Sequence, residues 1–432
     1  MKTMGSVSSK KGGVLVPLLL SVFIMGISIA TYLGLVSSHN RMTARSRAWN
    51  SSMPVLEAGV EEALTQIHYS VTNLSANGWL LSTGVYAKER VIGTSKYYVS
   101  ISTSLPPVIF AYGYVQLPLS TNYLTPPRTV RVTTTNDPLF KKGLVAKGSI
   151  DLSGNNVKTD SFDSADPAKS TGGVYDPAKS QANGDVATNS SVIDTLDVWN
   201  ADIYGHVSTG PGGNVLIGPN GSVGDKAWHA AGKKGLEAGY FSDDMNVSFP
   251  DVAIPTSTLW YTPTSGSLGG TNYEYLLTGG SYQISTVSMA ASKVLFVTGN
   301  SVLYVTGDLS LRGNAAIKVA AGVTLTIYAG GSVDIGGNGV SNGSGNAANF
   351  YLYGLPSSTS VSMSGNAAFT GVIYAPSADL TLGGGGSSLY DFVGASISKT
   401  VKLNGHYNFH YDENLGRIGP PREFVVATWN EI

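Results

Sequence analysis

An uncharged run near the start of the chain sets the first constraint on the fold. No charged side chain occurs between Gly12 and Ser38, and the stretch Val14–Val36 is almost wholly apolar. As a helix this stretch would be about 35 Å long, enough to cross the roughly 30 Å hydrocarbon core of a bilayer. The sequence therefore predicts a transmembrane helix over residues 14–38, preceded by a basic, leader-like tail over residues 1–13.

Three interpretations of this N-terminal region stay open. A secretory signal is one, because Ser28–Ala30 has small residues at the spacing of a cleavage site, although the apolar run exceeds the usual length. A plain membrane anchor is the second. The third is a prepilin-like leader, in which three lysines precede the pair Gly12-Gly13 and processing would occur after one of these glycines.

The residues after the span continue a helical pattern. Apolar residues recur every three or four positions at Leu56, Val60, Ala63, Leu64 and Ile67. This spacing is typical of an amphipathic helix with one buried face, and it predicts a stalk helix over residues 39–70. Pro54 predicts a break or kink in that helix, because proline removes a helical hydrogen bond.

The run Arg41–Leu64, which reads RMTARSRAWNSSMPVLEAGVEEAL, resembles the N-terminus of PilX-type minor pilins, above all in Glu57–Leu64. The resemblance covers roughly residues 10–70. It implies a membrane helix prolonged by a stalk, and pilin-like subunits as partners in a type IV pilus or pseudopilus. In one respect the sequence departs from the family: pilins carry Glu at mature position five, where cleavage after Gly12 or Gly13 would place Pro17 or Leu18.

Residues 71–140 alternate apolar and polar side chains, as in Lys96–Ser102 and Arg128–Thr133. Alternation with a period of two is typical of half-buried strands, so these residues predict a small antiparallel β unit.

After residue 140 a short motif recurs, in which two apolar residues flank a variable one and lead into Gly-Asn or a related pair. Its copies are Ile150–Val157, Leu309–Ile317, Val361–Phe369 and Val401–Phe409, with a partial copy at Val333–Asn338. Gly and Asn tolerate left-handed backbone angles, so each pair predicts a corner after a short strand. The 53 glycines and a charged share of only 13% suit a β domain with many tight turns.

Short strands joined at such corners predict a mainly β chain whose largest part is a single-stranded, right-handed parallel β-helix over residues 141–415. An excursion near residues 226–290, with one short helix, interrupts it, and residues 416–432 form a C-terminal tail. A β-sandwich is the alternative fold. In the β-helix, Leu311, Met363 and Leu403 should form a buried ladder with Leu152, while their neighbours Ser310, Ser362 and Lys402 point outward.

The C-terminal third resembles a poorly characterised β-helical domain that follows PilX-like N-termini in bacterial envelope proteins. The matching residues are Phe369–Pro376, Gly394, His410–Leu415 and Trp429–Glu431, and Thr159–Ser164 matches that family's aspartate-serine signature. The resemblance implies an association with pilus assembly.

Composition limits the chemistry that the chain can perform. The absence of cysteine excludes disulfides, cysteine-based metal sites and a cysteine nucleophile, and the net charge of −1 gives no basic stripe for nucleic acid. A calcium site is a weak hypothesis for Asp160, Asp163 and Asp166, whose oxygens lie close in sequence. His406 and His410, with Asp412 and Glu413, are interpreted as a hydrogen-bonded turn rather than a metal site.

The sequence thus predicts a non-enzymatic, pilin-like structural protein of the cell envelope, or a membrane-anchored surface adhesin, with no cofactor. It predicts a single-pass inner-membrane protein with a cytoplasmic N-terminus and its bulk in the periplasm or at the cell surface. Surface glycan is a further possible partner. The alternative function is a polysaccharide-active β-helix enzyme, although the charge clusters that such an enzyme needs are not evident.

Overall fold

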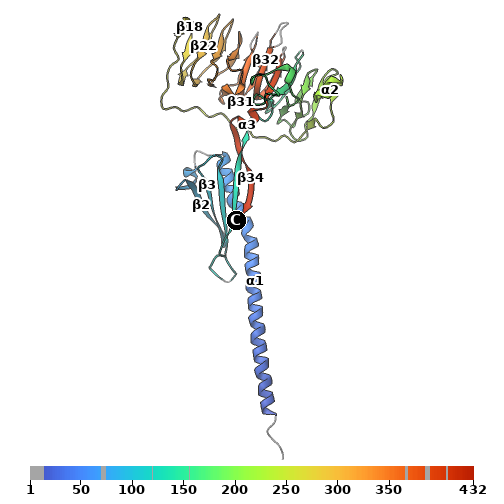
Figure 1. Cartoon of the computed structure of the whole chain (residues 1–432), viewed down its shortest axis with the longest axis vertical. Coiled ribbons are helices and arrows are strands. Elements are labelled where there is room, and N and C mark those ends of the chain that lie inside the picture. Colours follow the sequence, from blue (N-terminus) through green and yellow to red (C-terminus); the bar gives the residue numbers. More distant parts are fainter. Residues whose placement is uncertain are drawn as a thin grey trace, which may run out of the picture. The chain divides into compact units, whose positions relative to one another are not determined.

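The computed structural model describes residues 14–69, 74–118, 120–154, 156–364, 368–384, 390–404 and 407–432. The chain is mainly β with one long N-terminal helix. It divides into two compact units (Figure 1). Unit 1 consists of Met1–Asp137 and Glu423–Ile432, and unit 2 consists of Pro138–Arg422.

Helix α1 spans Leu15–Tyr69, so the predicted transmembrane and stalk segments form one continuous helix. Every side chain from Val14 to Leu35 is exposed, whereas Leu56, Val60 and Ile67 are buried. Within the described residues, α1 is the one helix long and apolar enough to cross a membrane, with a mean hydropathy of 2.2 in its most apolar window.

Pro54 lies inside α1, so the predicted break at this residue is wrong, whereas the alternative, a kink, stays a prediction. The helix is held here by strand β4 (Val108–Val115), where a Cβ on Gly113 would lie only 2.4 Å from the carbonyl oxygen of Ser52. Ser52 and Leu56 are fully buried at this close approach. Packing against the strand therefore compensates for the hydrogen bond that proline removes.

Unit 1 packs the second half of α1 against a six-stranded sheet. The strand order is β1-β2-β3-β4-β5-β34, and each of the first four strands pairs antiparallel with the next. A short 3-10 turn, η1 (Ser75–Asn77), leads from the helix to the sheet. The other strands are β1 Leu80–Ser82, β2 Val85–Ile92, β3 Ser95–Ser102, β5 Arg128–Pro138 and β34 Pro421–Glu431.

The C-terminal residues are not the tail that the sequence predicts for residues 416–432. Helix α3 (Leu415–Ile418) begins before them, and β34 completes the sheet of unit 1 beside β5. The side chain of Arg128 donates to Glu431 at 2.7 Å, and the backbone N–H of Ile432 donates to the carbonyl of Thr129 at 3.1 Å. Strand pairing over 300 residues of separation left no local signal in the sequence.

Unit 2 is a β-helix-like stack of parallel strands. From β19 to β28 each strand pairs in parallel with the strand three positions later, so three strands make one coil. The strands of the C-terminal half are β19 Tyr275–Leu277, β20 Gly280–Ile284, β21 Val287–Met289, β22 Val294–Val297, β23 Ser301–Val305, β24 Leu309–Leu311, β25 Ala316–Val319, β26 Leu325–Ala329, β27 Val333–Ile335, β28 Val340–Asn342, β29 Phe350–Gly354, β30 Ser360–Met363, β31 Phe369–Leu382, β32 Tyr390–Leu403 and β33 Tyr407–Asp412.

The N-terminal half of unit 2 forms its own coils. These contain β6 Leu144–Ala146, β7 Ile150–Asp151, β8 Lys158–Phe162, β9 Val186–Thr188, β10 Leu196–Trp199, β11 Asp202–Tyr204, β12 Val207–Ser208, β13 Val215–Ile217, β14 Ser222–Gly224, β15 Gly235–Leu236 and β16 Phe241–Ser242, with helix α2 (Lys226–Ala230) between β14 and β15.

The coils do not stack in chain order. Strand β32 pairs in parallel with β6 and β7, and β33 pairs with β8, so the last coil lies directly on the first. Figure 1 shows this as red strands beside green ones. The chain therefore enters and leaves unit 2 at one place, where the N–H of Leu139 donates to the carbonyl of Pro420 at 3.0 Å.

The predicted ladder is present. Leu311, Met363 and Leu403 are fully buried and lie in one column, which Ile335 and Leu382 complete on the intervening strands. Leu152 is also fully buried, and β7 just before it pairs with Val401 and Lys402 of β32. The prediction of the ladder's register is confirmed.

The predicted Gly-Asn corners are confirmed at two copies of the motif. Gly313 and Gly337 both have a φ of +65°, and each occupies the first central position of a turn closed by an i to i+3 hydrogen bond. The corner at Gly365 and the pair Gly405-His406 lie outside the described residues.

Substituting Gly337 tests how tightly the corners are packed. A Cβ at Gly337 would lie 2.7 Å from the carbonyl oxygen of Ala315 in the preceding coil, whereas Gly322, with a φ of +74°, has open space around it. Gly322→Ala should therefore cost only the left-handed strain of about 1–2 kcal/mol, and Gly337→Ala clearly more. Urea unfolding of the two variants measures this; equal losses would contradict the packed corner.

The excursion is shorter than the predicted residues 226–290. Parallel pairing already resumes at β19, and only residues 243–265, here called the strap, lack helices and strands before the small hairpin of β17 (Gly266–Leu268) and β18 (Thr271–Tyr273). The strap crosses a row of tyrosines that are in register on successive coils, Tyr304, Tyr328, Tyr353 and Tyr374. The hydroxyl of Tyr374 donates to the carbonyl of Pro250 at 2.6 Å. The missing Gly-Asn motif in β19–β21 explains the overlong prediction.

Candidate functional site

The two signature segments that the sequence singles out, Thr159–Ser164 and His410–Leu415, lie side by side in the structure. Strand β33 pairs in parallel with β8, which places His410 beside Asp160 and Asp412 beside Phe162. We call the polar residues around this pairing the coil junction, because they connect the first coil of unit 2 with its last. The network contains most of the buried charge in unit 2.

Asp160 is a fully buried carboxylate of the coil junction. Its Oδ2 accepts a hydrogen bond from the hydroxyl of Tyr175 at 2.8 Å and forms an ion pair with Lys158 at 2.9 Å. Its Oδ1 contacts Nδ1 of His410. The Tyr175 ring stacks on the His410 ring at 3.7 Å. Burial by itself raises the pKa of Asp160, but His410 and Lys158 outweigh it and hold that pKa below its usual value.

A second pair of carboxylates, Asp163 and Asp412, lies at the end of the same strands. Asp163 accepts a hydrogen bond from Arg417 at 2.6 Å, and although burial opposes it, this partner lowers the pKa of Asp163. One oxygen of Asp412 accepts the N–H groups of Ser164 and Asn414, at 3.0 and 3.1 Å. The other oxygen is buried with no hydrogen-bond partner among the described residues, and burial raises the pKa of Asp412.

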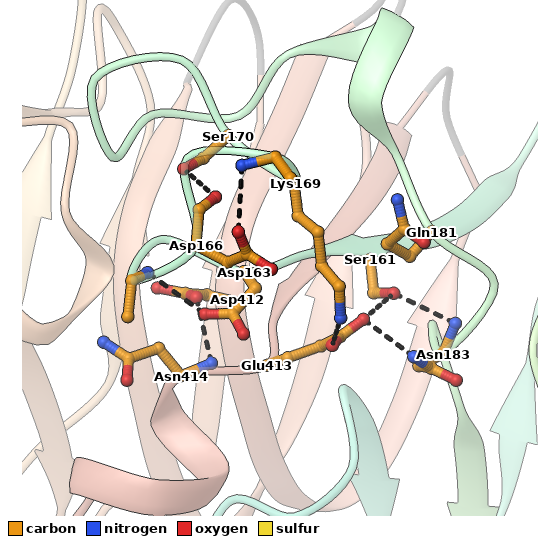
Figure 2. Close-up of polar contacts among 12 residues, drawn as sticks. Ser161, Asp163, Asp166, Lys169, Ser170, Gln181, Asn183, Asp412, Glu413 and Asn414 are labelled. Atoms are coloured by element: carbon orange, nitrogen blue, oxygen red, sulfur yellow. Dashed lines mark hydrogen bonds and ion pairs between the residues drawn. The ribbon is translucent and has the colours of Figure 1, made fainter.

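Glu413 ties three segments of the first coil to the last (Figure 2). Its carboxylate accepts hydrogen bonds from Ser161 and Asn183, both at 2.8 Å, and from Lys169 at 3.3 Å. The N–H of Asn183 in turn donates to the hydroxyl of Ser161 at 2.9 Å. Every one of these groups is therefore engaged in holding the loop of residues 163–183 against β33.

The three aspartates of the calcium hypothesis do not share a common centre. Asp160 is bound by His410, Lys158 and Tyr175, Asp163 by Arg417, and Asp166 accepts the N–H of Ala168 in its own turn at 2.9 Å. Across the described ranges no three His, Asp or Glu side chains are grouped so as to hold a metal ion. Calcium binding stays a prediction. Gly12, Gly13 and His406 lie outside the described residues.

The hydrogen bonds and ion pairs of the coil junction hold together two parts of the chain that are far apart in sequence. Sequence reasoning pointed to Asp160, Asp163, Asp412 and Glu413 but missed Lys158, Tyr175 and Arg417 as their partners. The sequence Asp-Pro-Ala-Lys-Ser occurs twice, at Asp166–Ser170 and at Asp176–Ser180, and Tyr175 directly precedes the second copy. This repeat is the one sequence signal that lies beside Tyr175. The partners come from a strand, a loop and a short helix, so no spacing rule connects them.

A family model described as a domain of unknown function (DUF7305) matches residues 261–418. The search of curated proteins finds no match. One solved structure, the competence-associated pilin ComZ from Thermus thermophilus, is 11% identical, with 89% of this chain and 98% of that chain covered. The TM-score of this match is 0.26.

Proposed function

We propose that the chain is a pilin-like, non-enzymatic structural protein of the bacterial cell envelope. Helix α1 anchors it in the inner membrane with a cytoplasmic N-terminus, and unit 2 forms a right-handed β-helix in the periplasm or at the cell surface. The proposed partners are the inner membrane and other pilin-like subunits of a type IV pilus or pseudopilus, and an anchored adhesin is the other form of the same role.

The observation that carries this proposal is the change in surroundings along α1. Its side chains from Val14 to Leu35 are exposed and apolar, whereas one face from Ala48 onward is buried on the sheet of unit 1. An exposed apolar helix of this length is stable in lipid but not in water. The PilX-like run Arg41–Leu64 lies where the exposed part passes into the buried part, which supports a pilin-like stalk.

Charge placed in the middle of the span tests the anchor. Leu20 and Ile24 are one turn apart and both exposed, and an arginine at the centre of a membrane helix costs about 2.5–3.5 kcal/mol on insertion scales. The double variant Leu20→Arg/Ile24→Arg should leave the membrane fraction after cell fractionation. The control Met42→Arg, beyond the uncharged run, should remain there.

The orientation of the chain in the membrane is tested by a separate experiment in cells. Alkaline phosphatase fused after Ile432 should be active, because that enzyme folds only outside the cytoplasm. If a reporter that fluoresces only in the cytoplasm were fluorescent when fused at the same position, the proposed orientation would be wrong. N-terminal sequencing of the mature protein decides whether processing leaves Gly13 or Val14 as the first residue, as the leader hypothesis for Gly12 and Gly13 requires, or leaves Met1 in place.

A further inference from the structure

One outward column of unit 2 carries a regular series of polar side chains. Strands β21, β24, β27, β30 and β31 pair in register and place one polar residue each in this column. We call it the polar column, and its members are Ser288, Ser310, Asp334, Ser362 and Thr381. Neighbouring strands lie about 4.8 Å apart, so the column repeats its hydroxyl and carboxylate groups at that interval.

The side chains of the polar column are free to bond with a ligand. In the part of the chain that the structure describes, none of the five has a side-chain hydrogen bond or ion pair, and all are at least partly exposed. At the coil junction, by contrast, the carboxylates of Asp160, Asp163 and Glu413 accept hydrogen bonds from the protein itself.

A groove borders the column at the Gly-Asn corners. Its lining includes the side chains of Arg312, Asn314, Asp334, Asn338 and Ser364. The glycines Gly313, Gly336 and Gly337 also line it. Neither the guanidinium of Arg312 nor the carboxylate of Asp334 forms an ion pair with any described residue. One free positive and one free negative group therefore face the same groove, and their charges cancel.

We propose that the polar column and this corner groove bind a neutral glycan that lies along the stack of coils. Sugar hydroxyls both donate and accept hydrogen bonds, and the groove offers donors on Arg312 and the asparagines and acceptors on Asp334 and the serines. The balanced charge disfavours acidic polymers. A polymer with a regular repeat can use equivalent groups on successive coils, so many weak contacts add up.

This inference deepens the proposed function, because unit 2 meets an envelope or host glycan only when it lies outside the cytoplasm. The experiments can show the glycan-binding inference to be wrong without affecting the proposed function, and the reverse. The phosphatase fusion reports orientation whether or not sugar binds, and the binding experiment below uses purified protein whatever its orientation in the cell.

The test uses the full chain reconstituted in lipid nanodiscs and titrated with cellohexaose, chitohexaose and mannohexaose, with polygalacturonate as the acidic probe. At least one neutral hexasaccharide should bind. Arg312→Ala and Asp334→Ala should each weaken that binding about tenfold, which equals about 1.4 kcal/mol. The matched control Lys318→Ala removes an exposed charge on β25, at a position outside the groove, and should leave the affinity unchanged.

Ser362→Lys provides an independent variant, because it obstructs the polar column with a longer side chain at a half-exposed position. It should also weaken binding while leaving the unfolding midpoint close to that of the natural protein. The proposal is overturned if no neutral hexasaccharide binds or if only polygalacturonate binds. It is also overturned if Arg312→Ala, Asp334→Ala and Ser362→Lys all bind the hexasaccharide as tightly as the natural protein does.

Discussion

Replacing Leu311 by alanine is expected to lower the free energy of unfolding of unit 2 by about 2–5 kcal/mol. Leu311 is fully buried in a column of apolar residues, between Met289 on one neighbouring strand and Ile335 on the other. Removing its side chain loses the transfer free energy of the deleted carbons and leaves a cavity that the rigid neighbouring coils cannot fill. Urea unfolding of the full chain in detergent, followed by circular dichroism, measures the change.

Neighbouring residues on the outer face provide the controls. Ser310→Ala should change the stability by no more than about 0.5 kcal/mol, because the Ser310 side chain points out of the stack. Leu403→Ala should reproduce the loss seen with Leu311→Ala. Lys402→Ala should not, since its ion pair with Asp151 at 3.1 Å is largely exposed. Similar losses at Leu311 and Ser310 would show that the assigned register is wrong.

The second large effect is expected at the coil junction. Asp160→Ala leaves the partly buried Lys158 without its counter-charge, removes the acceptor of Tyr175 and removes the contact with Nδ1 of the buried His410. Breaking a buried ion pair by removing one partner costs about 3–5 kcal/mol, and the partial exposure of Lys158 places this case near 3 kcal/mol. The control Asp166→Ala loses one turn hydrogen bond and should cost about 1 kcal/mol.

The effect of Asp160 depends on pH in a defined direction. Because its folded-state pKa lies below the unfolded value of about 3.9, its stabilising contribution is complete above that pH and is lost as the pH falls through the folded-state pKa. The difference in unfolding midpoint between the natural protein and Asp160→Ala should therefore narrow below about pH 4. A difference that stays constant from pH 7 to pH 3 would mean that Asp160 contributes through packing alone.

Features set by neighbouring residues could be predicted from the sequence. The alternation around Leu311 and Leu403 fixes which side chains are buried, because successive residues of a strand face opposite sides. Gly313 and Gly337 predict corners, because few residues other than glycine adopt a positive φ. The apolar run Val14–Val36 predicts its helix for the same local reason.

Features that depend on residues far apart in the chain could not be predicted from the sequence. Nothing near Asp160 indicates that His410 lies beside it, since the pairing of β8 with β33 depends on the whole path of the chain. The same holds for β34, whose partner β5 is far away in sequence. At Pro54 the helix continues where a break is one of the two predictions, because the close packing of Ser52 and Leu56 on Gly113 offsets the lost hydrogen bond of the helix.

The order of the coils has a consequence for biosynthesis. The coil of β6–β8 is made early, yet the strands that cover one of its edges, β32 and β33, follow more than 200 residues later. Until then its backbone groups offer an open edge on which other extended chains can add. Pairings this distant in sequence also form slowly. The growing polypeptide thus carries an unfinished sheet for most of its synthesis, until β33 ends at Asp412 and the last strand pairing can form.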